Sequence, residues 1–191
     1  MREERTDEIP AIDIEPLFGL PSAEREQTDR QIFDAASSIG FMTVRGFPGA
    51  ELLTSAKGAE LLRIFELSDA AKEKLLRWNF DPSQPNYYRG WFPLQPAAVS
   101  YKEGIDMGPD VAHADAAHDP EDPLLERTPL PAEAELPGWR AVVGRYYVSM
   151  ENVGAALMAS IARSLGLNQN AFDDFSWRHL HAAPDPLPPA R

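Results

Sequence analysis

The feature that most constrains this chain is a long amphipathic segment near its C-terminal end. Apolar side chains recur there at steps of three and four residues, which places them on one side of an α-helix. They are Trp139, Val142, Val143, Tyr146, Met150, Val153, Leu157, Ile161 and Leu165. Gly138 precedes the pattern and Gly166 follows it, so the sequence predicts a helix over residues 139–166. Such a stripe indicates a structural core, because burying each of these side chains contributes about 1.5 to 3 kcal/mol.

Composition limits the classes of function. The 191 residues are 43% hydrophobic and 25% charged, which is typical of one globular domain. A net charge of -12 disfavours a nucleic-acid partner, because phosphate binding needs a basic face. With no cysteine, disulfides and thiolate sites are excluded, and this absence suits the cytoplasm. Residues 1–5 are charged and lead into no apolar run, and the long helix is too charged to cross a membrane.

The residues before the long helix predict a helix-rich α/β (α+β) fold with a few short strands. The spacing of the apolar residues identifies each element, and turn residues separate one element from the next. We expect strands at 9–14 and 41–44, helices at 22–39 and 52–65, and a third helix capped by Ser68 and Asp69.

From residue 79 the pattern becomes irregular. Residues 86–94 are aromatic and semi-extended, and 102–110 predict a short strand. Residues 111–137 are rich in Pro, Asp, Glu and Ala, which indicates a surface excursion. Residues 176–191 carry prolines at 184, 186, 188 and 189, and we expect a disordered tail there.

Several segments in this order resemble a known family. They are Ile9-Pro10-Ala11-Ile12-Asp13, residues 39–44, Phe65-Glu66-Leu67-Ser68 with Lys72 and Lys74, Arg89-Gly90-Trp91, and residues 102–106. The long helix and its ending at 165–175 also fall where the family has them. The chain thus resembles the N-terminal part of the isopenicillin N synthase-like Fe(II)/2-oxoglutarate oxygenases, over residues 9–175.

The resemblance implies a catalytic domain that this sequence does not contain. Members of the family hold iron with two His and one Asp in a double-stranded β-helix, and a late Arg binds 2-oxoglutarate. Only 25 residues follow Gly166, and none alternate as its strands would. We therefore expect a dioxygenase N-terminal domain at 1–175, incomplete without that β-helix, and a truncated or frame-shifted reading frame or an isolated domain. The chain should bind no cofactor, whereas Fe(II) and 2-oxoglutarate are implied for the intact enzyme.

One triplet matches the iron motif by letter. His113-Ala114-Asp115 reads His-x-Asp, His118 lies nearby, and His179 or His181 lies at the distance of a third ligand. Rigid strands normally hold such ligands, but these residues fall in the excursion and the Pro-rich tail. We interpret them as a solvated acidic loop and expect no tight Fe(II) or Zn(II) binding.

Substrate binding has three candidate residues. Tyr87, Tyr88 and Arg89 combine aromatic rings with a guanidinium, which can bind a carboxylate bidentately. In the family, the corresponding region lies near the mouth of the catalytic pocket. The alternative is structural: an Arg stacked on aromatic rings closes a turn.

Two classes of function follow. In the first, the chain is the N-terminal portion of an oxygenase that oxidises a small organic substrate, and it is inactive alone. In the second, it is a non-catalytic interaction module derived from that domain. In either class, apolar surface left uncovered by the β-helix would favour self-association.

Overall fold

The computed structural model describes residues 8–78, 81, 83–84, 86–94, 102–114, 116, 118–119, 122 and 125–173. The chain divides into two compact units. The described residues of the first unit are 8–50 and 149–173, and the second unit takes its described residues from 51–148. The tail expected at 176–191 lies outside the described residues.

The first unit pairs two short strands with a helix. Strand β1 (Ala11–Asp13) is parallel to β2 (Thr43–Arg45), with Ile12 opposite Val44. A 3₁₀ helix (Glu15–Phe18) and α1 (Ala23–Ser38) connect the strands. Helix α1 begins as the sequence predicts, because the Ser22 hydroxyl accepts a hydrogen bond from the Arg25 amide at 3.2 Å.

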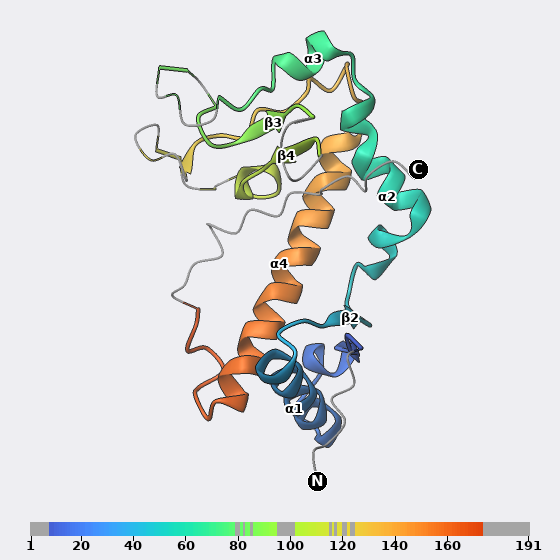
Figure 1. Ribbon diagram of the computed structural model, residues 1–191, viewed down its shortest axis with the longest axis vertical. Helices are drawn as coiled ribbons and strands as arrows, with labels where there is room; N and C mark the ends of the chain where they lie inside the picture. The colour runs from blue at the N-terminus through green and yellow to red at the C-terminus, as the bar shows by residue number, and fades with distance from the viewer. Residues whose placement is uncertain are drawn as a thin grey trace. The chain divides into compact units, whose positions relative to one another are not determined.

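The core of the first unit lies between β1, α1 and the C-terminal part of α4 (Trp139–Ser164), against which α1 lies in Figure 1. Its buried side chains are Ile12, Ile14, Ile32, Ala35, Phe47 and Val153. Ser149 of α4 donates a hydrogen bond to the Pro48 carbonyl at 2.7 Å. Helix α4, late in the chain, thus completes a core whose other buried residues come from the first fifty positions.

The second unit begins within a series of short helices. They are a 3₁₀ helix (Ala50–Leu53), α2 (Ser55–Leu62), a second 3₁₀ helix (Arg63–Glu66) and α3 (Asp69–Glu73). The predicted helix over 52–65 is therefore interrupted. Thr54 is extended, with ψ at 154°, and its hydroxyl donates to the Glu51 carbonyl at 2.9 Å, so the chain restarts as α2 after this residue.

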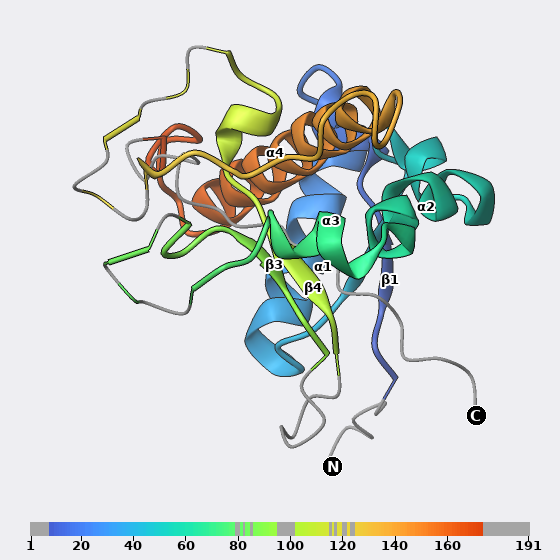
Figure 2. The same ribbon diagram turned by 90° about the horizontal axis from the view of Figure 1, so that it is seen from above.

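Strands β3 (Gly90–Phe92) and β4 (Gly104–Asp106) form an antiparallel pair in the second unit, side by side in Figure 2. A 3₁₀ helix (Pro109–Val111) follows them. The core of this unit contains Leu61, Ile64, Leu75, Trp91, Ile105, Met107, Val111, Leu136, Trp139, Val142, Val143 and Tyr147. The segment expected to be a surface excursion contributes buried residues, namely Val111, Thr128 and Leu136.

Helix α4 confirms the main prediction from the sequence. It spans Trp139–Ser164, within the predicted 139–166, and Gly166 adopts a left-handed φ of 72°. The stripe differs by one position in its middle, where Tyr147 is buried and Tyr146 is half-buried. Residues 139–148 of α4 belong to the second unit and the rest to the first. The helix-rich fold with a long helix and a few short strands is as predicted.

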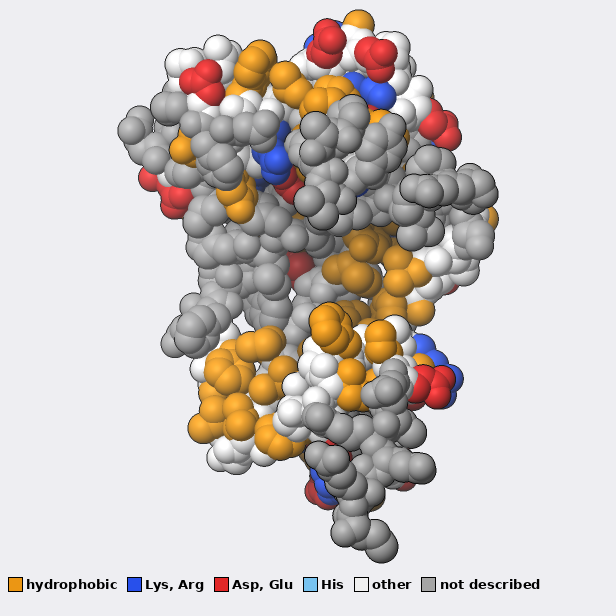
Figure 3. All heavy atoms as spheres, in the orientation of Figure 1, with side chains coloured by type: hydrophobic (Ala, Val, Ile, Leu, Met, Phe, Trp, Pro, Cys, Tyr) orange, Lys and Arg blue, Asp and Glu red, His pale blue; other side chains and the backbone are white. Residues whose placement is uncertain are grey.

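Apolar side chains also reach the surface, as Figure 3 shows for one face. In the first unit the large exposed ones include Leu20 and Phe41, which are 86% and 69% exposed. In the described part of the chain, no helix combines the length and the apolar character needed to cross a membrane.

Gly90 should be intolerant of a side chain. It has a φ of 126°, and a Cβ there would overlap the Leu75 carbonyl oxygen. We expect Gly90→Ala to lower the free energy of unfolding by about 2 kcal/mol or more, measured by urea denaturation. Gly58→Ala is the control, because Gly58 lies in α2 with open space around it and should gain about 0.5 to 1 kcal/mol. Equal losses in both variants would contradict this account.

Candidate functional site

The three candidate residues form a turn that leads into β3. Asn86 starts the turn with a left-handed φ of 59°. The backbone amides of Tyr87, Tyr88 and Arg89 all donate to the carboxylate of Glu126, the first at 2.9 Å. Three consecutive amides on one carboxylate form a charge-assisted anchor, which fixes the backbone of the turn.

The Arg89 side chain points into the unit and is only 1% exposed. Its Nη1 lies 3.1 Å from a carboxylate oxygen of Asp110 and also donates to the Glu126 carbonyl. A buried guanidinium needs such partners, because an unpaired charge in the interior is costly. Arg89 is therefore an ion-pair partner of Asp110 inside the unit, where the alternative interpretation of the sequence expected it to stack on aromatic rings.

Two neighbours complete the surroundings of Arg89. A Cβ on Gly108 would overlap the guanidinium carbon, so the guanidinium fills the space that this glycine leaves. Thr128 donates to Asp110 from its amide at 2.8 Å and from its hydroxyl at 2.7 Å. The Thr128 hydroxyl also accepts a bond from the Gly108 amide at 2.9 Å. Asp110 is thus held in place for Arg89.

Tyr87 and Tyr88 differ from Arg89 in exposure, because both are half-buried. Their backbones are fixed by Glu126 and part of each side chain reaches the surface. Two phenol groups on a rigid turn can donate hydrogen bonds to a polar ligand and offer ring surface to an apolar one. The structure thus places the Arg89 guanidinium inside the unit and leaves the side chains of Tyr87 and Tyr88 partly exposed.

Sequence reasoning missed Glu126, Asp110 and Thr128. The hydrogen bonds from the turn to Glu126 span 37 to 39 positions in the chain. Glu126 and Thr128 also lie in the segment assigned to the surface, and one acidic residue among many carries no local signal. The only usable hint was Gly108-Pro109-Asp110, a turn directly after β4.

The His-x-Asp triplet is only partly described. The His113 ring makes an edge contact with Tyr147 at 6.4 Å between ring centroids. His118 Nδ1 lies 3.1 Å from the Leu125 carbonyl oxygen. Asp115, His179 and His181 lie outside the described residues. Among the residues that are described, no group of three or more His, Asp or Glu side chains is placed to hold a metal ion.

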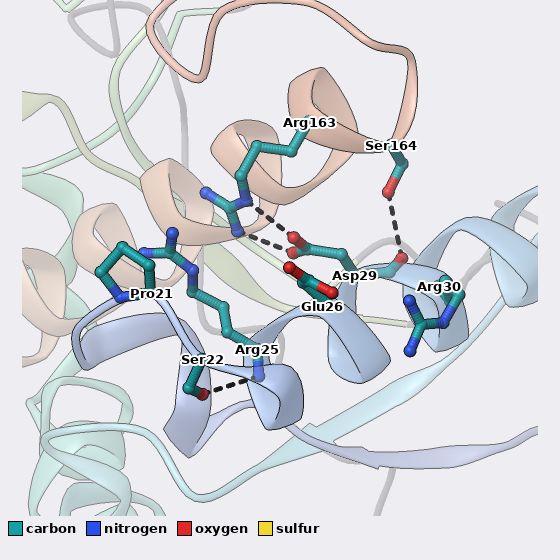
Figure 4. Close-up of a pocket in the computed structure, with 8 residues that line it drawn as sticks. All are labelled: Pro21, Ser22, Arg25, Glu26, Asp29, Arg30, Arg163 and Ser164. Carbon is teal, nitrogen blue, oxygen red and sulfur yellow. Dashed lines mark hydrogen bonds and ion pairs between the residues drawn. The ribbon is translucent and has the colours of Figure 1, made fainter.

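A second polar site is a hollow of about 310 Å³ in the first unit, shown in Figure 4. It lies between the start of α1 and the last turn of α4. Its lining residues are Pro21, Ser22, Arg25, Glu26, Asp29, Arg30, Arg163 and Ser164. The Arg163 guanidinium donates from Nε and Nη2 to the two carboxylate oxygens of Asp29, each at 2.7 Å. None of the residues predicted from the sequence as binding residues lies here.

The charge state of Asp29 follows from its neighbours. Burial raises its pKa, but the hydrogen bonds and charge of Arg163, together with the charge of Arg25, lower the pKa below its usual value overall. Asp29 is therefore ionised at neutral pH, and its ion pair with Arg163 joins α1 to α4.

The chain is similar to known proteins over most of its length. Residues 9–133 match the family model described as the N-terminal region of the non-haem dioxygenase in morphine synthesis. Curated relatives include an isopenicillin N synthase from Streptomyces clavuligerus, 25% identical over 86% of this chain and 50% of its own length. The 2-oxoglutarate-Fe(II) type oxidoreductase ppzC of Metarhizium rileyi is 26% identical over 91% of this chain and 49% of its own length.

Solved structures agree on the fold. A full-length protein of Neurospora crassa in complex with alpha-KG matches with a TM-score of 0.68 and 20% identity, over 87% of this chain and 50% of that protein. The same Neurospora protein in complex with alpha-KG and thymine matches with a TM-score of 0.65 and 18% identity, over 86% of this chain and 50% of that protein. This chain therefore spans about half the length of the curated relatives and structures that it matches.

Glu126 should be the most sensitive residue of the turn. Glu126→Gln removes the charge that three amides share, and we expect the free energy of unfolding to fall by about 1 to 3 kcal/mol. Hydrogen exchange should also quicken at the amides of residues 87–89. Glu73→Gln is the matched control, because Glu73 is exposed on α3 and should change stability by less than about 0.5 kcal/mol. Unchanged exchange at the turn would refute the anchor.

Asp29 should make stability depend on pH. Because the folded pKa is lowered, its contribution is complete above the unfolded pKa of about 3.9 and is lost as pH falls through the folded value. Asp29→Asn should therefore cost about 1 to 3 kcal/mol at neutral pH and little near pH ~2, measured by urea unfolding. Asp34→Asn, at an exposed position of the same helix, should show no such pH-dependent difference. A cost for Asp29→Asn that is the same at both pH values would contradict the ion-pair account.

Proposed function

This chain belongs to the family of non-haem dioxygenase N-terminal domains, and on that premise we propose that it is the N-terminal portion of an Fe(II)/2-oxoglutarate-dependent oxygenase that oxidises a small organic substrate. The observation that carries the proposal is the family match over residues 9–133. The relatives support it, and this chain covers about half of the length of each. A cytoplasmic location remains a prediction.

The iron chemistry is assigned to the other part of the intact enzyme. The described residues contain no three-ligand group for a metal, so they do not fit the iron of the family. The role of this chain is instead to support the catalytic domain and to border its pocket.

Tyr87 and Tyr88 are the residues that we propose for substrate contact. They lie on a turn fixed by Glu126, and each keeps part of its side chain at the surface. Arg89 serves the same site as a positioning residue, because its ion pair with Asp110 holds the end of the turn from inside the unit. A substrate that presents both a polar group and an apolar surface fits two neighbouring phenols.

A non-catalytic interaction module is the second candidate. Exposed large apolar side chains of the first unit favour it, among them Leu20, Phe41 and Leu165. Such surface would be covered either by a catalytic domain or by a second protein, including another copy of this chain. The two candidates differ in their prediction for the gene: the first requires a His-x-Asp strand, a distant His and a late Arg in coding sequence that continues this chain.

The chain alone should not turn over 2-oxoglutarate. We expect no succinate above background when the purified chain is incubated with Fe(II), ascorbate and 2-oxoglutarate, because the described residues supply no iron site. A characterised 2-oxoglutarate oxygenase, assayed in the same buffer, is the positive control. Succinate formation, or sub-micromolar Fe(II) binding that His113→Ala abolishes in calorimetry, would overturn this assignment.

A further inference from the structure

The hollow between α1 and α4 carries a local excess of positive charge on an acidic chain. The whole sequence has 30 acidic residues against 18 Lys and Arg. Three arginines line this hollow, Arg25, Arg30 and Arg163, against two carboxylates, Glu26 and Asp29. Neighbouring guanidinium groups repel one another unless an anion lies between them. The hollow can therefore attract an anion only if some of these arginine charges lack a partner within the chain.

Beside Asp29, the guanidinium groups of Arg163 and Arg25 have hydrogen-bond donors that Asp29 does not use. Arg163 uses Nε and Nη2 for Asp29, and its Nη1 has no acceptor among the described residues. Arg25 extends from α1 toward the Arg163 guanidinium in Figure 4, and its charge acts on Asp29 as well. Within the part of the chain that the structure describes, the Arg25 guanidinium forms no hydrogen bond or ion pair. Arg163 thus takes both oxygens of Asp29, and the Arg25 guanidinium is left with only the longer-range charge of that carboxylate.

The other lining groups do not pair with the Arg25 guanidinium. Arg30 lies on the other side of Glu26 and Asp29 from Arg25 in Figure 4. Glu26 is exposed and forms no ion pair within the described residues. The first turn of α1 is already capped, because the Ser22 hydroxyl accepts from the Arg25 amide. Guanidinium groups from two helices, and not a helix end, therefore form the site.

We propose that this hollow binds a small oxyanion of the phosphate type between Arg25 and Arg163. A planar guanidinium donates two parallel hydrogen bonds to such an anion, which makes arginine well suited to phosphate recognition. The volume of about 310 Å³ is larger than one phosphate needs, and Pro21 provides an apolar wall. The anion is therefore either free or carried on a small molecule. This site is independent of the oxygenase function proposed above.

The test is phosphate binding by the full 191-residue chain in a phosphate-free buffer at constant ionic strength. Calorimetry with inorganic phosphate should give saturable binding of one ion, and phosphate should raise the melting temperature. Arg25→Gln should weaken binding about tenfold or more, because it removes charge-assisted donors. Arg45→Gln is the matched control: it also removes one positive charge in the same unit, from a side chain that is 71% exposed and outside the hollow.

The outcomes separate the proposal from its alternatives. Binding that survives Arg45→Gln and is lost in Arg25→Gln supports the site. No saturable binding by the unaltered chain, equal binding by Arg25→Gln, or equal losses in both variants would overturn it. Circular dichroism verifies the fold of each variant, and if Arg25→Gln does not fold, Arg25→Lys should still weaken binding because the planar fork is gone. Comparing glycerol phosphate with inorganic phosphate then distinguishes a carried anion from a free one.

Discussion

Burial of one side of α4 is the constraint on which the rest of the structure depends. Both hydrophobic clusters contain residues of this helix: Trp139, Val143 and Tyr147 in one, and Val153 in the other. Trp139 is 1% exposed and its indole donates to the Leu61 carbonyl at 2.9 Å, so the largest side chain of the helix is also satisfied as a donor. The short strands of this chain form two-stranded pairs, and pairs of this kind are marginal by themselves. They are ordered because the helix supplies the surface that they cover.

Polar interactions, by contrast, determine where the candidate binding residues lie. The turn at 87–89 is fixed by one carboxylate, and the Arg89 ion pair is fixed by the hydrogen bonds of Thr128 to Asp110. The ion pair between Asp29 and Arg163 fixes α1 on α4 in the same way. Each of these joins residues far apart in the chain. The apolar contacts thus give the units their cores, and the charged contacts give specific side chains their positions.

The sequence predicts the elements better than the interactions. The spacing of apolar residues predicts α4, and Ser22 predicts the start of α1, because both signals are local. The predicted helix over 52–65 was interrupted at Thr54, where a side-chain bond to the backbone competes with the helical pattern. The role of Glu126 cannot be predicted from the sequence, because no local pattern links it to a turn almost forty residues earlier. The composition of residues 111–137 predicts a segment at the surface, yet Thr128, two residues after Glu126, is buried.

The close approach of Arg89 to Gly108 links the evolution of two positions. The guanidinium occupies the volume that a side chain at 108 would take. A larger residue at 108 would displace a charged group from its carboxylate partner in the interior, whereas a shorter residue at 89 would leave Asp110 uncompensated and a void behind. Substitution at either position is therefore conditional on the other, and homologues that lack the glycine should also lack the arginine.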